Sequence, residues 1–334
     1  MSLRSITRRD FLAGAGALGA ASLLGVPQTA FAEPPPEVTT IRLAALGAIC
    51  FAPQFVAEYF LHLEGFSDVE YVPVHNDIPS TLATLSDLAM FGGPSIIPAI
   101  DNGFPISVIA GLHQGCWELF AHPPVNNIRD LRDKAIAITA MGGVEHVWLS
   151  SILAYVGIDP RTEVEWVPTK KFGDAKVMYL EGKADAFFAF PPEPQELRAK
   201  NVGRVIMNTT IDRPWSQYYC CMLGARNEFI ERNPIATRRA LRAILKAADV
   251  CTEDPERGAR VLVDGGWEHR YEIALEVLNT LSYDRWRTDN PADSIRFHAL
   301  RLYDVGMIKS TPQEIIERGC KFDFLNELKK ELKA

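Results

Sequence analysis

The sequence changes character at the stretch Asp212-Arg-Pro-Trp-Ser-Gln-Tyr-Tyr-Cys-Cys-Met-Leu223. Before this stretch, short apolar segments alternate with helix-like segments, and after it almost every segment has a helical pattern. The stretch combines aromatic residues with two adjacent cysteines, namely Trp215, Tyr218, Tyr219, Cys220 and Cys221. It is therefore either a chemical centre or the place where the chain crosses between two parts of the protein.

The overall composition is that of a soluble globular protein. The 334 residues are 47% hydrophobic and 23% charged, which is enough for two lobes with separate cores. The formal net charge is −7, and the sequence contains no basic block. This charge argues against nucleic acid as a partner and against binding to an acidic membrane surface.

The first 32 residues are typical of an export signal. Arg8 and Arg9 precede an apolar run over residues 13–26, and Ala30-Phe-Ala32 is a small-x-small cleavage site. The arginine pair resembles a twin-arginine signal, and the apolar run is shorter than the roughly 20 residues of a membrane span. We therefore expect a periplasmic protein, cleaved after about Ala32 and without direct membrane insertion. Cleavage removes three arginines and one aspartate, so the formal charge becomes −9.

All six cysteines lie after the cleavage site. A chain with a twin-arginine signal folds in the reducing cytoplasm before export, so we expect buried free thiols rather than disulfides. These cysteines are Cys50, Cys116, Cys220, Cys221, Cys251 and Cys320.

Two cycles of strands and helices follow a proline-rich linker over residues 33–40. This alternation predicts mostly parallel sheets covered by helices on both faces. Strands are expected near 41–46, 69–74, 87–91 and 106–112, and then near 135–139, 164–167, 186–190 and 204–207. Helices follow from 227 onward, and Asp254-Pro255, Asn290-Pro291 and Thr311-Pro312 are typical helix starts.

Several segments occur in the order seen in a known family. They are Ala45-Leu-Gly47, Ala57-Glu-Tyr-Phe60, Gly92-Gly-Pro-Ser95, Val108-Ile-Ala-Gly-Leu-His-Gln-Gly115, Ile128-Arg-Asp-Leu-Arg-Asp-Lys134 and Leu180-Glu-Gly-Lys-Ala-Asp-Ala186. Together they resemble the nitrate/sulfonate/taurine group of ABC-transporter solute-binding proteins, whose fold is shared by thiamine-pyrimidine-synthesis proteins. The resemblance covers the chain from about Ile41 to the C-terminus.

The resemblance implies a two-lobed type 2 periplasmic binding protein of the Venus-flytrap kind. Each lobe is expected to be a mostly parallel sheet flanked by helices, and the C-terminal tail is expected to be helical. Residues 41–122 and 219–334 would form lobe 1, and residues 123–218 would form lobe 2, with crossings near His122-Pro-Pro124 and in the stretch 212–223. A monomer would close on a small solute and dock on the cognate ABC permease, whose ATPase drives import.

Loops at the ends of the predicted strands supply the candidate ligand contacts. Ligands of open α/β sheets bind at the carboxyl ends of strands, where glycines and helix N-termini give access to backbone N–H groups. Each of these residues could instead be an ordinary turn, cap or core residue. The candidate ligand-binding residues are Cys50, Phe51, Gly93, Ser95, His113, Trp117, Gly143, Val144, Glu145, Phe190, Glu193, Trp215, Tyr218 and Tyr219.

The side chains expected in the cleft favour a particular class of solute. They include many aromatic rings and the acids Glu145 and Glu193, but no arginine cluster of the kind that binds carboxylates or sulfonates. We therefore expect a neutral or weakly basic aromatic or heteroaromatic solute. Lys170, Lys171 and Arg213 leave a sulfonate- or nitrate-type anion as the alternative.

The cysteines raise the possibility of chemistry. His113 and Cys116 form a His-x-x-Cys pair, but two ligands do not make a metal site. If residues 215–223 form a strand, Cys220 and Cys221 point to opposite faces and cannot share one ion without a bend. We therefore expect no metal, no cofactor and no catalysis. The alternatives are an iron-dependent pyrimidine-synthesis-like enzyme, which shares this fold and has a cysteine-rich run in the same region, and a periplasmic sensor subunit.

Overall fold

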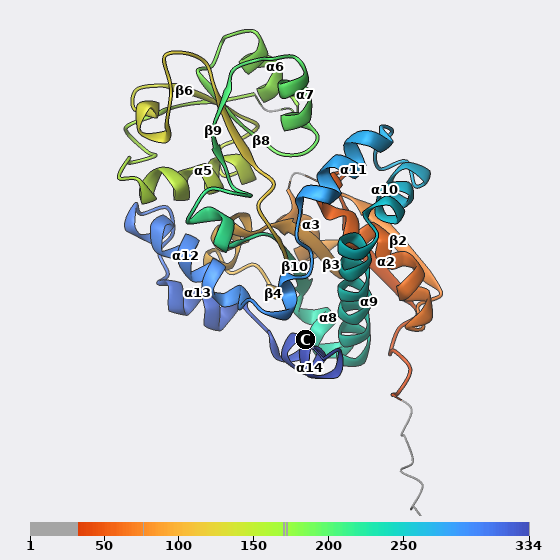
Figure 1. Ribbon diagram of the computed structural model, residues 1–334. Helices are drawn as coiled ribbons and strands as arrows, with labels where there is room; N and C mark the ends of the chain where they lie inside the picture. Colours follow the sequence, from red (N-terminus) through yellow and green to blue (C-terminus); the bar gives the residue numbers. More distant parts are fainter. Residues whose placement is uncertain (1–32, 76, 170, 172, 334) are drawn as a thin grey trace, which may run out of the picture. The chain divides into compact units, whose positions relative to one another are not determined.

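The computed structural model describes residues 33–333 apart from residues 76, 170 and 172. The export signal and its cleavage site lie outside these residues. Residues 36–334 form one compact unit with two five-stranded sheets, which we call sheet A and sheet B (Figure 1). No helix in the described ranges is both long and apolar enough to cross a membrane.

Sheet A takes four strands from the first part of the chain and one from the middle. Its strands are β1 (Thr40–Ala45), β2 (Asp68–Pro73), β3 (Leu88–Gly92), β4 (Ile106–Gln114) and β10 (Tyr219–Arg226), in the order β2-β1-β3-β10-β4. Only β10 runs antiparallel to its neighbours. The strand that brings the chain back to sheet A is therefore inserted between β3 and β4, and it is buried along almost its whole length.

Sheet B repeats this arrangement. Its strands are β5 (Glu118–Ala121), β6 (Ala135–Ile138), β7 (Glu165–Pro168), β8 (Ala186–Ala189) and β9 (Arg204–Asn208), in the order β7-β6-β8-β5-β9. Only β5, the strand by which the chain enters the sheet, is antiparallel to its neighbours. The predicted fold class, two mostly parallel sheets flanked by helices, is confirmed.

The first crossing between the sheets lies earlier in the chain than the sequence predicts. The chain leaves sheet A after Gln114 and enters sheet B at Glu118, so residues 118–121 do not belong to the sheet of residues 41–114. Leu119 and Phe120 are buried in sheet B, while Gly115 provides the turn with a φ of 64°. The second crossing runs through residues 209–218. Trp215–Gln217 forms a short 3-10 helix, η4, so the strand predicted from residue 215 begins only at Tyr219.

Helices follow the strands of each sheet. Those of sheet A are η1 (Ile49–Phe51), α2 (Ala52–Leu63), α3 (Ile78–Thr84), η2 (Gly93–Ser95) and α4 (Ile96–Asp101). Those of sheet B are η3 (Ile128–Leu131), α5 (Val144–Tyr155), α6 (Asp174–Leu180) and α7 (Glu193–Ala199). As in other α/β sheets, these crossover helices cover the apolar faces of the strands.

The C-terminal third is helical, as predicted. It contains α8 (Asn227–Arg232), α9 (Pro234–Glu253), α10 (Pro255–Asp264), α11 (Tyr271–Thr280), η5 (Arg285–Arg287), α12 (Pro291–Asp304), α13 (Pro312–Gly319) and α14 (Asp323–Glu331). The three predicted starts are capped, because the side chains of Asp254, Asn290 and Thr311 accept backbone N–H groups of α10, α12 and α13.

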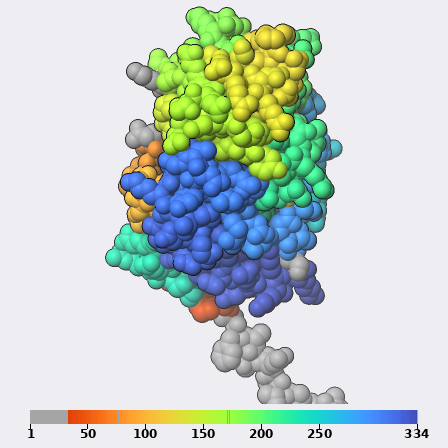
Figure 2. Space-filling view, turned by 90° about the vertical axis from the view of Figure 1, so that its left-hand side faces the viewer, coloured from red at the N-terminus to blue at the C-terminus, as the bar shows by residue number. Residues whose placement is uncertain are grey.

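This helical region packs against the helices of sheet A and against those of sheet B. α9 packs against α2 and buries Leu241, Ile244 and Leu245. α12 packs against α5, where Ser151 Oγ lies 2.8 Å from His298 Nδ1. Figure 2 shows these C-terminal residues, in blue, against the yellow-green residues of the sheet B half.

Candidate functional site

A cavity of about 320 Å³ lies at the carboxyl ends of strands from both sheets. We call it the strand-end cavity. Its walls come from the segments that follow β1, β2, β3, β6 and β8, together with Cys221 of β10 and the crossing at Trp117. This is the position at which open α/β sheets bind ligands.

Aromatic rings form much of the cavity wall. Phe51 comes from the sheet A side, Phe190 from the sheet B side, and Trp117 from the segment between them. The Trp117 ring lies 4.9 Å from Phe190 and 4.7 Å from Phe188, measured between ring centroids. A solute in this cavity therefore meets flat apolar surfaces held by packing behind them.

Glu145 is the buried acid of the cavity. It lies in the first turn of α5, and its Oε1 accepts a hydrogen bond of 2.8 Å from Thr139 Oγ1. Burial raises the pKa of the Glu145 carboxyl above its ordinary value, although the hydrogen bonds from its own backbone and from Thr139 oppose this effect. Asp77 also lines the cavity, but it is exposed and caps α3 by accepting from Ser80 N at 2.7 Å.

Among the residues that the structure describes, the lining of this cavity contains no basic side chain. No lysine or arginine of the described residues lines the strand-end cavity. Lys170 lies outside those residues, and Arg213 lines a different hollow. The arrangement therefore suits an apolar solute with a hydrogen-bond donor better than a bare anion.

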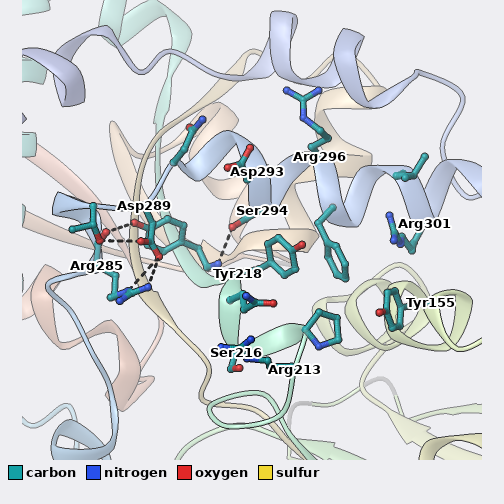
Figure 3. A pocket seen from close by; sticks show the side chains of 17 residues that line it. Tyr155, Arg213, Ser216, Tyr218, Arg285, Asp289, Asp293, Ser294, Arg296 and Arg301 are labelled. Atoms are coloured by element: carbon teal, nitrogen blue, oxygen red, sulfur yellow. Dashed lines mark hydrogen bonds and ion pairs between the residues drawn. The ribbon is translucent and has the colours of Figure 1, made fainter.

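A second, wider hollow runs beside α12, and we call it the α12 groove (Figure 3). Its volume is about 990 Å³, and its lining includes Arg213, Arg285, Arg296 and Arg301. Arg285 is paired with Asp289 at 3.2 Å. Because small-molecule sites are concave and mostly apolar, this open and charged groove is the weaker candidate despite its size.

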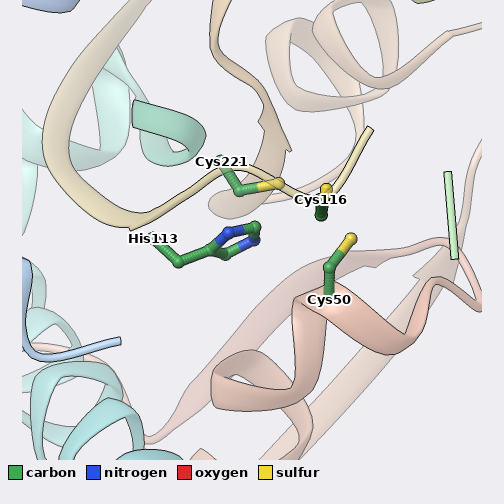
Figure 4. Close-up of side chains that lie close together, drawn as sticks. All are labelled: Cys50, His113, Cys116 and Cys221. Carbon is green, nitrogen blue, oxygen red and sulfur yellow. The ribbon is translucent and has the colours of Figure 1, made fainter. Parts of the chain in front are cut away.

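Four potential metal ligands lie together at the wall of the strand-end cavity, and Figure 4 shows their side chains. The ligand atoms of Cys50, His113, Cys116 and Cys221 all lie within 4.8 Å of one another, and all four residues are buried. Cys50 and Cys221 also line the cavity. We call these four residues the Cys-His cluster.

The position of Cys221 corrects the prediction for the cysteine pair. The strand was expected to place Cys220 and Cys221 on opposite faces, but their sulfur atoms lie only 3.6 Å apart. A bulge causes this, because Tyr219 pairs with Gln114 and Cys221 pairs with His113, which leaves Cys220 as the extra residue. Cys220 Sγ then lies 2.9 Å from Cys116 Sγ.

The electrostatics of the cluster differ from one thiol to the next. Burial raises the pKa of the Cys116 and Cys220 thiols well above the ordinary value. Burial also opposes ionisation of Cys221, but hydrogen bonds from the neighbouring thiols outweigh it and lower the pKa of Cys221 well below its ordinary value.

The structure brings eight of the fourteen predicted site residues to the strand-end cavity. These are Cys50, Phe51, Ser95, Trp117, Gly143, Val144, Glu145 and Phe190. Their contact with a ligand stays a prediction.

The other six lie elsewhere. His113 belongs to the Cys-His cluster, and Glu193 is buried at the start of α7. Gly93 follows Gly92, which lines the cavity in its place. The three aromatic residues of the second crossing, Trp215, Tyr218 and Tyr219, do not line the cavity.

η4 replaces the first part of the predicted strand, so Trp215 and Tyr218 do not have strand positions, while Tyr219 begins β10. Tyr218 and Tyr219 line the α12 groove, where the Tyr218 ring stacks on Phe297 with centroids 3.9 Å apart. The Tyr219 hydroxyl donates to the Arg285 carbonyl at 2.7 Å. Trp215 is buried beside Tyr155.

Sequence reasoning missed Cys116 and Cys221 as neighbours of Cys50. The signal was present, since three cysteines and one histidine occur at strand ends or crossings that the fold brings together. Gly92 and Thr139 were also missed, although both directly end strands whose loops were singled out.

Known proteins match this chain over most of its length. Residues 99–262 match the NMT1-like family, and residues 5–25 match the twin-arginine translocation signal sequence. The nitrate/nitrite binding protein NrtA of Synechocystis is 23% identical over 324 residues, with 78% of this chain and 70% of NrtA covered.

Solved structures share the fold. NrtA from Synechocystis superimposes with a TM-score of 0.71 at 17% identity, covering 90% of both chains. The aliphatic sulphonate binding protein SsuA from Escherichia coli gives a TM-score of 0.65 at 17% identity, covering 85% of this chain and 93% of SsuA. The desulfurization enzyme DszB gives 0.59 at 12% identity, with 89% of this chain and all of DszB covered, so the fold is not confined to binding proteins.

The signal match agrees with the twin-arginine pattern at Arg8 and Arg9 and identifies an exported, periplasmic protein. The fold, the position of the cavity and the sequence match to NrtA agree with one another. Residues 99–262 carry an NMT1-like family domain, and the chain is a homologue of the nitrate/nitrite binding protein NrtA.

Proposed function

We propose that this protein binds a small, neutral or weakly basic aromatic or heteroaromatic solute in the strand-end cavity and delivers it to an ABC importer. The observation that carries the proposal is the lining itself. It combines the rings of Phe51, Trp117 and Phe190 with one buried acid, Glu145, and no basic residue of the described part of the chain.

An anion is the less favourable solute. NrtA is named for nitrate and nitrite, and SsuA for aliphatic sulphonates. Burying such an anion next to Glu145, where no arginine or lysine of the described residues lines the cavity to pair with it, leaves charge uncompensated in an apolar site. The same cavity accepts a flat ring with little cost, because the ring replaces water on apolar walls.

Glu145 gives the cavity its preference for a nitrogen base. Its carboxyl lines the cavity and accepts hydrogen bonds from Thr139 Oγ1 and from its own backbone, and a carboxylate has further acceptor positions that a ligand can use. A carboxyl whose pKa is raised by burial can share a proton with a ring nitrogen or an adjacent amino group. Such a pair satisfies both partners without burying an isolated charge.

The volume sets the size of the solute. Ligand pockets span about 300–1,000 Å³, so a cavity of about 320 Å³ corresponds to one or two fused rings. Closure of the sheet A and sheet B halves around this solute would give the permease and its ATPase a distinct liganded form to recognise. We expect a monomer in solution.

A thermal-shift screen tests this function. Purified protein is heated with aminopyrimidines and other heteroaromatic amines, aromatic acids, aliphatic sulfonates and nitrate at equal concentration. A ligand at 100 times its Kd stabilises the native state by about 2.7 kcal/mol, so the true class raises Tm clearly. Heteroaromatic amines are expected to give the largest shifts, and a larger shift with nitrate or a sulfonate would contradict the proposal.

Small-angle scattering tests the closure itself. The radius of gyration of the protein is expected to decrease when the best ligand of the screen is added at saturation. An unchanged scattering curve at full occupancy would contradict a mechanism that depends on closure.

We also propose that the protein has no catalytic activity of its own. Mass spectrometry of the bound solute after prolonged incubation should recover it chemically unchanged. Conversion of the solute would instead favour an enzyme on this fold, as DszB illustrates. A sensor role would show as binding of the liganded protein to a signalling partner rather than to a permease.

A further inference from the structure

The Cys-His cluster has the ligand set and the spacing of a tetrahedral metal centre. Three sulfur atoms and one imidazole nitrogen lie within 4.8 Å of one another. Sulfur ligands at about 2.3 Å from a zinc ion are about 3.8 Å apart in a tetrahedron, so small side-chain movements suffice to close the site. Figure 4 shows the four side chains directed toward a common point.

His113 is oriented as a metal ligand would be. Its Nδ1 lies 3.2 Å from the Gln114 carbonyl oxygen, and this contact places the ring proton on Nδ1. Nε2 then carries a lone pair, and it is buried with no hydrogen-bond partner among the described residues. Metal-binding histidines commonly donate their other N–H to a backbone carbonyl in this way.

The surrounding residues hold the ligands in place. The Tyr283 ring packs edge-on against His113 with centroids 5.0 Å apart, and its hydroxyl donates to the Cys50 carbonyl at 3.2 Å. The first contact holds the imidazole ring of His113, and the second holds the backbone that carries the Cys50 side chain.

Two irregularities of the backbone serve the cluster. The bulge at Cys220 turns Cys221 toward His113, its pairing partner on β4. Cys116 has a φ of 126°, which is unfavourable for a residue with a side chain and persists only where the surroundings enforce it. Cys116 lies in the first crossing between the sheets, and Cys220 lies near the start of β10, directly after the second crossing.

We infer that Cys50, His113, Cys116 and Cys221 bind one zinc-class ion as a closed Cys3His centre. Thiolate sulfur and imidazole nitrogen select soft or borderline ions and disfavour magnesium and calcium. Three Zn–S bonds and one Zn–N bond form as the three thiols release their protons to solvent. Because the protein supplies all four ligands, the centre is structural and joins η1, β4 and β10 to the first crossing between the sheets.

The competing use of these thiols is a disulfide. Cys116 and Cys220 have sulfur atoms 2.9 Å apart, and the periplasm permits oxidation. A chain with a twin-arginine signal folds before export, so an ion bound in the cytoplasm would already hold Cys116 as a ligand. The proposal therefore predicts that Cys116 and Cys220 are not bridged in the exported protein.

Metal analysis of the exported protein, purified without chelators, tests the inference. We expect about one zinc-class ion per chain. Cys221→Ser should lower the metal content more than about tenfold, since it removes one of four ligands. Cys220→Ser and Cys251→Ser are the matched controls: each removes a buried cysteine outside the four ligands, and each should leave the content unchanged.

A second measurement covers the case in which Cys221→Ser does not fold. Cobalt(II) added to the metal-depleted wild-type protein should give the visible bands of a tetrahedral site and thiolate-to-metal absorption in the near ultraviolet. A wild-type protein that binds neither zinc nor cobalt, or a Cys116–Cys220 disulfide found by mass spectrometry in the exported protein, would overturn the proposal. Neither readout depends on the solute, so failure here leaves the proposed transport function standing.

Discussion

The strand-end cavity and the α12 groove are both lined by residues of one short region, yet their chemistry is opposite. Cys221 of β10 lines the cavity, whereas Tyr218, directly before β10, lines the groove. The cavity is small, aromatic and supplied with one buried acid, and the groove is wide and carries paired charges on exposed side chains. The difference shows that the enclosure of a hollow indicates a small-molecule site better than its volume or its number of charged side chains. A small solute gains most from leaving water where the walls surround it.

The largest expected difference concerns the aromatic walls. Trp117→Ala removes a buried ring from the cavity wall and should lower the free energy of unfolding by about 3–5 kcal/mol. Tyr218→Ala removes a partly exposed ring from the groove and should lower it by about 1–2 kcal/mol. Urea denaturation of both variants measures this difference, and equal losses would show that the two walls are packed alike.

The next effect is on solute affinity. Glu145→Gln keeps the size of the side chain but removes the carboxyl that pairs with a basic nitrogen, so affinity should fall by about 1.5–3 kcal/mol, or roughly 10- to 150-fold. Asp293→Asn in the α12 groove is the matched control and should leave the affinity unchanged. Isothermal titration with the best ligand of the screen measures the affinity of both variants. A larger loss of affinity in Asp293→Asn than in Glu145→Gln would show that the solute binds in the α12 groove.

The free energy of unfolding is expected to depend on pH through the buried Glu193 but not through Asp293 of the α12 groove. Burial raises the pKa of Glu193 to about 8, whereas an ordinary glutamate has 4.5. Between pH 4.5 and 8, Glu193 is deprotonated in the unfolded chain but still protonated in the native protein. The contribution of Glu193 to stability is therefore complete below about pH 4.5 and is lost as the pH rises through about 8. The loss amounts to about 1.4 kcal/mol for each pH unit.

Unfolding free energies measured at several pH values test this contribution. Glu193→Gln, which cannot ionise, should flatten the decline relative to the wild-type protein. Asp293→Asn should leave the slope as it is, because Asp293 is exposed. Identical slopes for the wild-type protein and Glu193→Gln would show that Glu193 is ionised in the native state.

The smallest effect is expected from the charges of the groove. Arg285→Ala breaks an ion pair between the exposed Arg285 and the half-buried Asp289, and pairs near the surface contribute about 1 kcal/mol or less. Neither solute affinity nor metal content should change. A loss of solute binding in this variant would contradict the assignment of the α12 groove as a mere surface hollow.

Local patterns in the sequence predicted much of this architecture. Alternating apolar segments identified two mostly parallel sheets, and polar residues before prolines identified the starts of α10, α12 and α13. Because parallel strands end at one edge of a sheet, the loops containing Phe51, Glu145 and Phe190 could be placed at one cavity.

The remaining features depend on pairing between distant segments. The bulge at Cys220 exists only because β10 pairs with β4, more than a hundred residues earlier in the chain. In a regular strand the side chains of Cys220 and Cys221 would point to opposite faces, as the sequence predicted. The structure instead places their sulfur atoms close together. The first crossing was misplaced for a similar reason, since nothing local to residues 118–121 shows that they pair with β8 and β9.

Competitive isothermal titration tests the central claim most directly. The best heteroaromatic ligand is titrated into the wild-type protein alone and then in the presence of excess nitrate or of an aliphatic sulfonate. We predict one site per chain, a negative heat-capacity change from burial of apolar surface, and an affinity that neither anion alters. Displacement of the ligand by nitrate or by the sulfonate would contradict the account, because it would mean that the cavity is built for an anion.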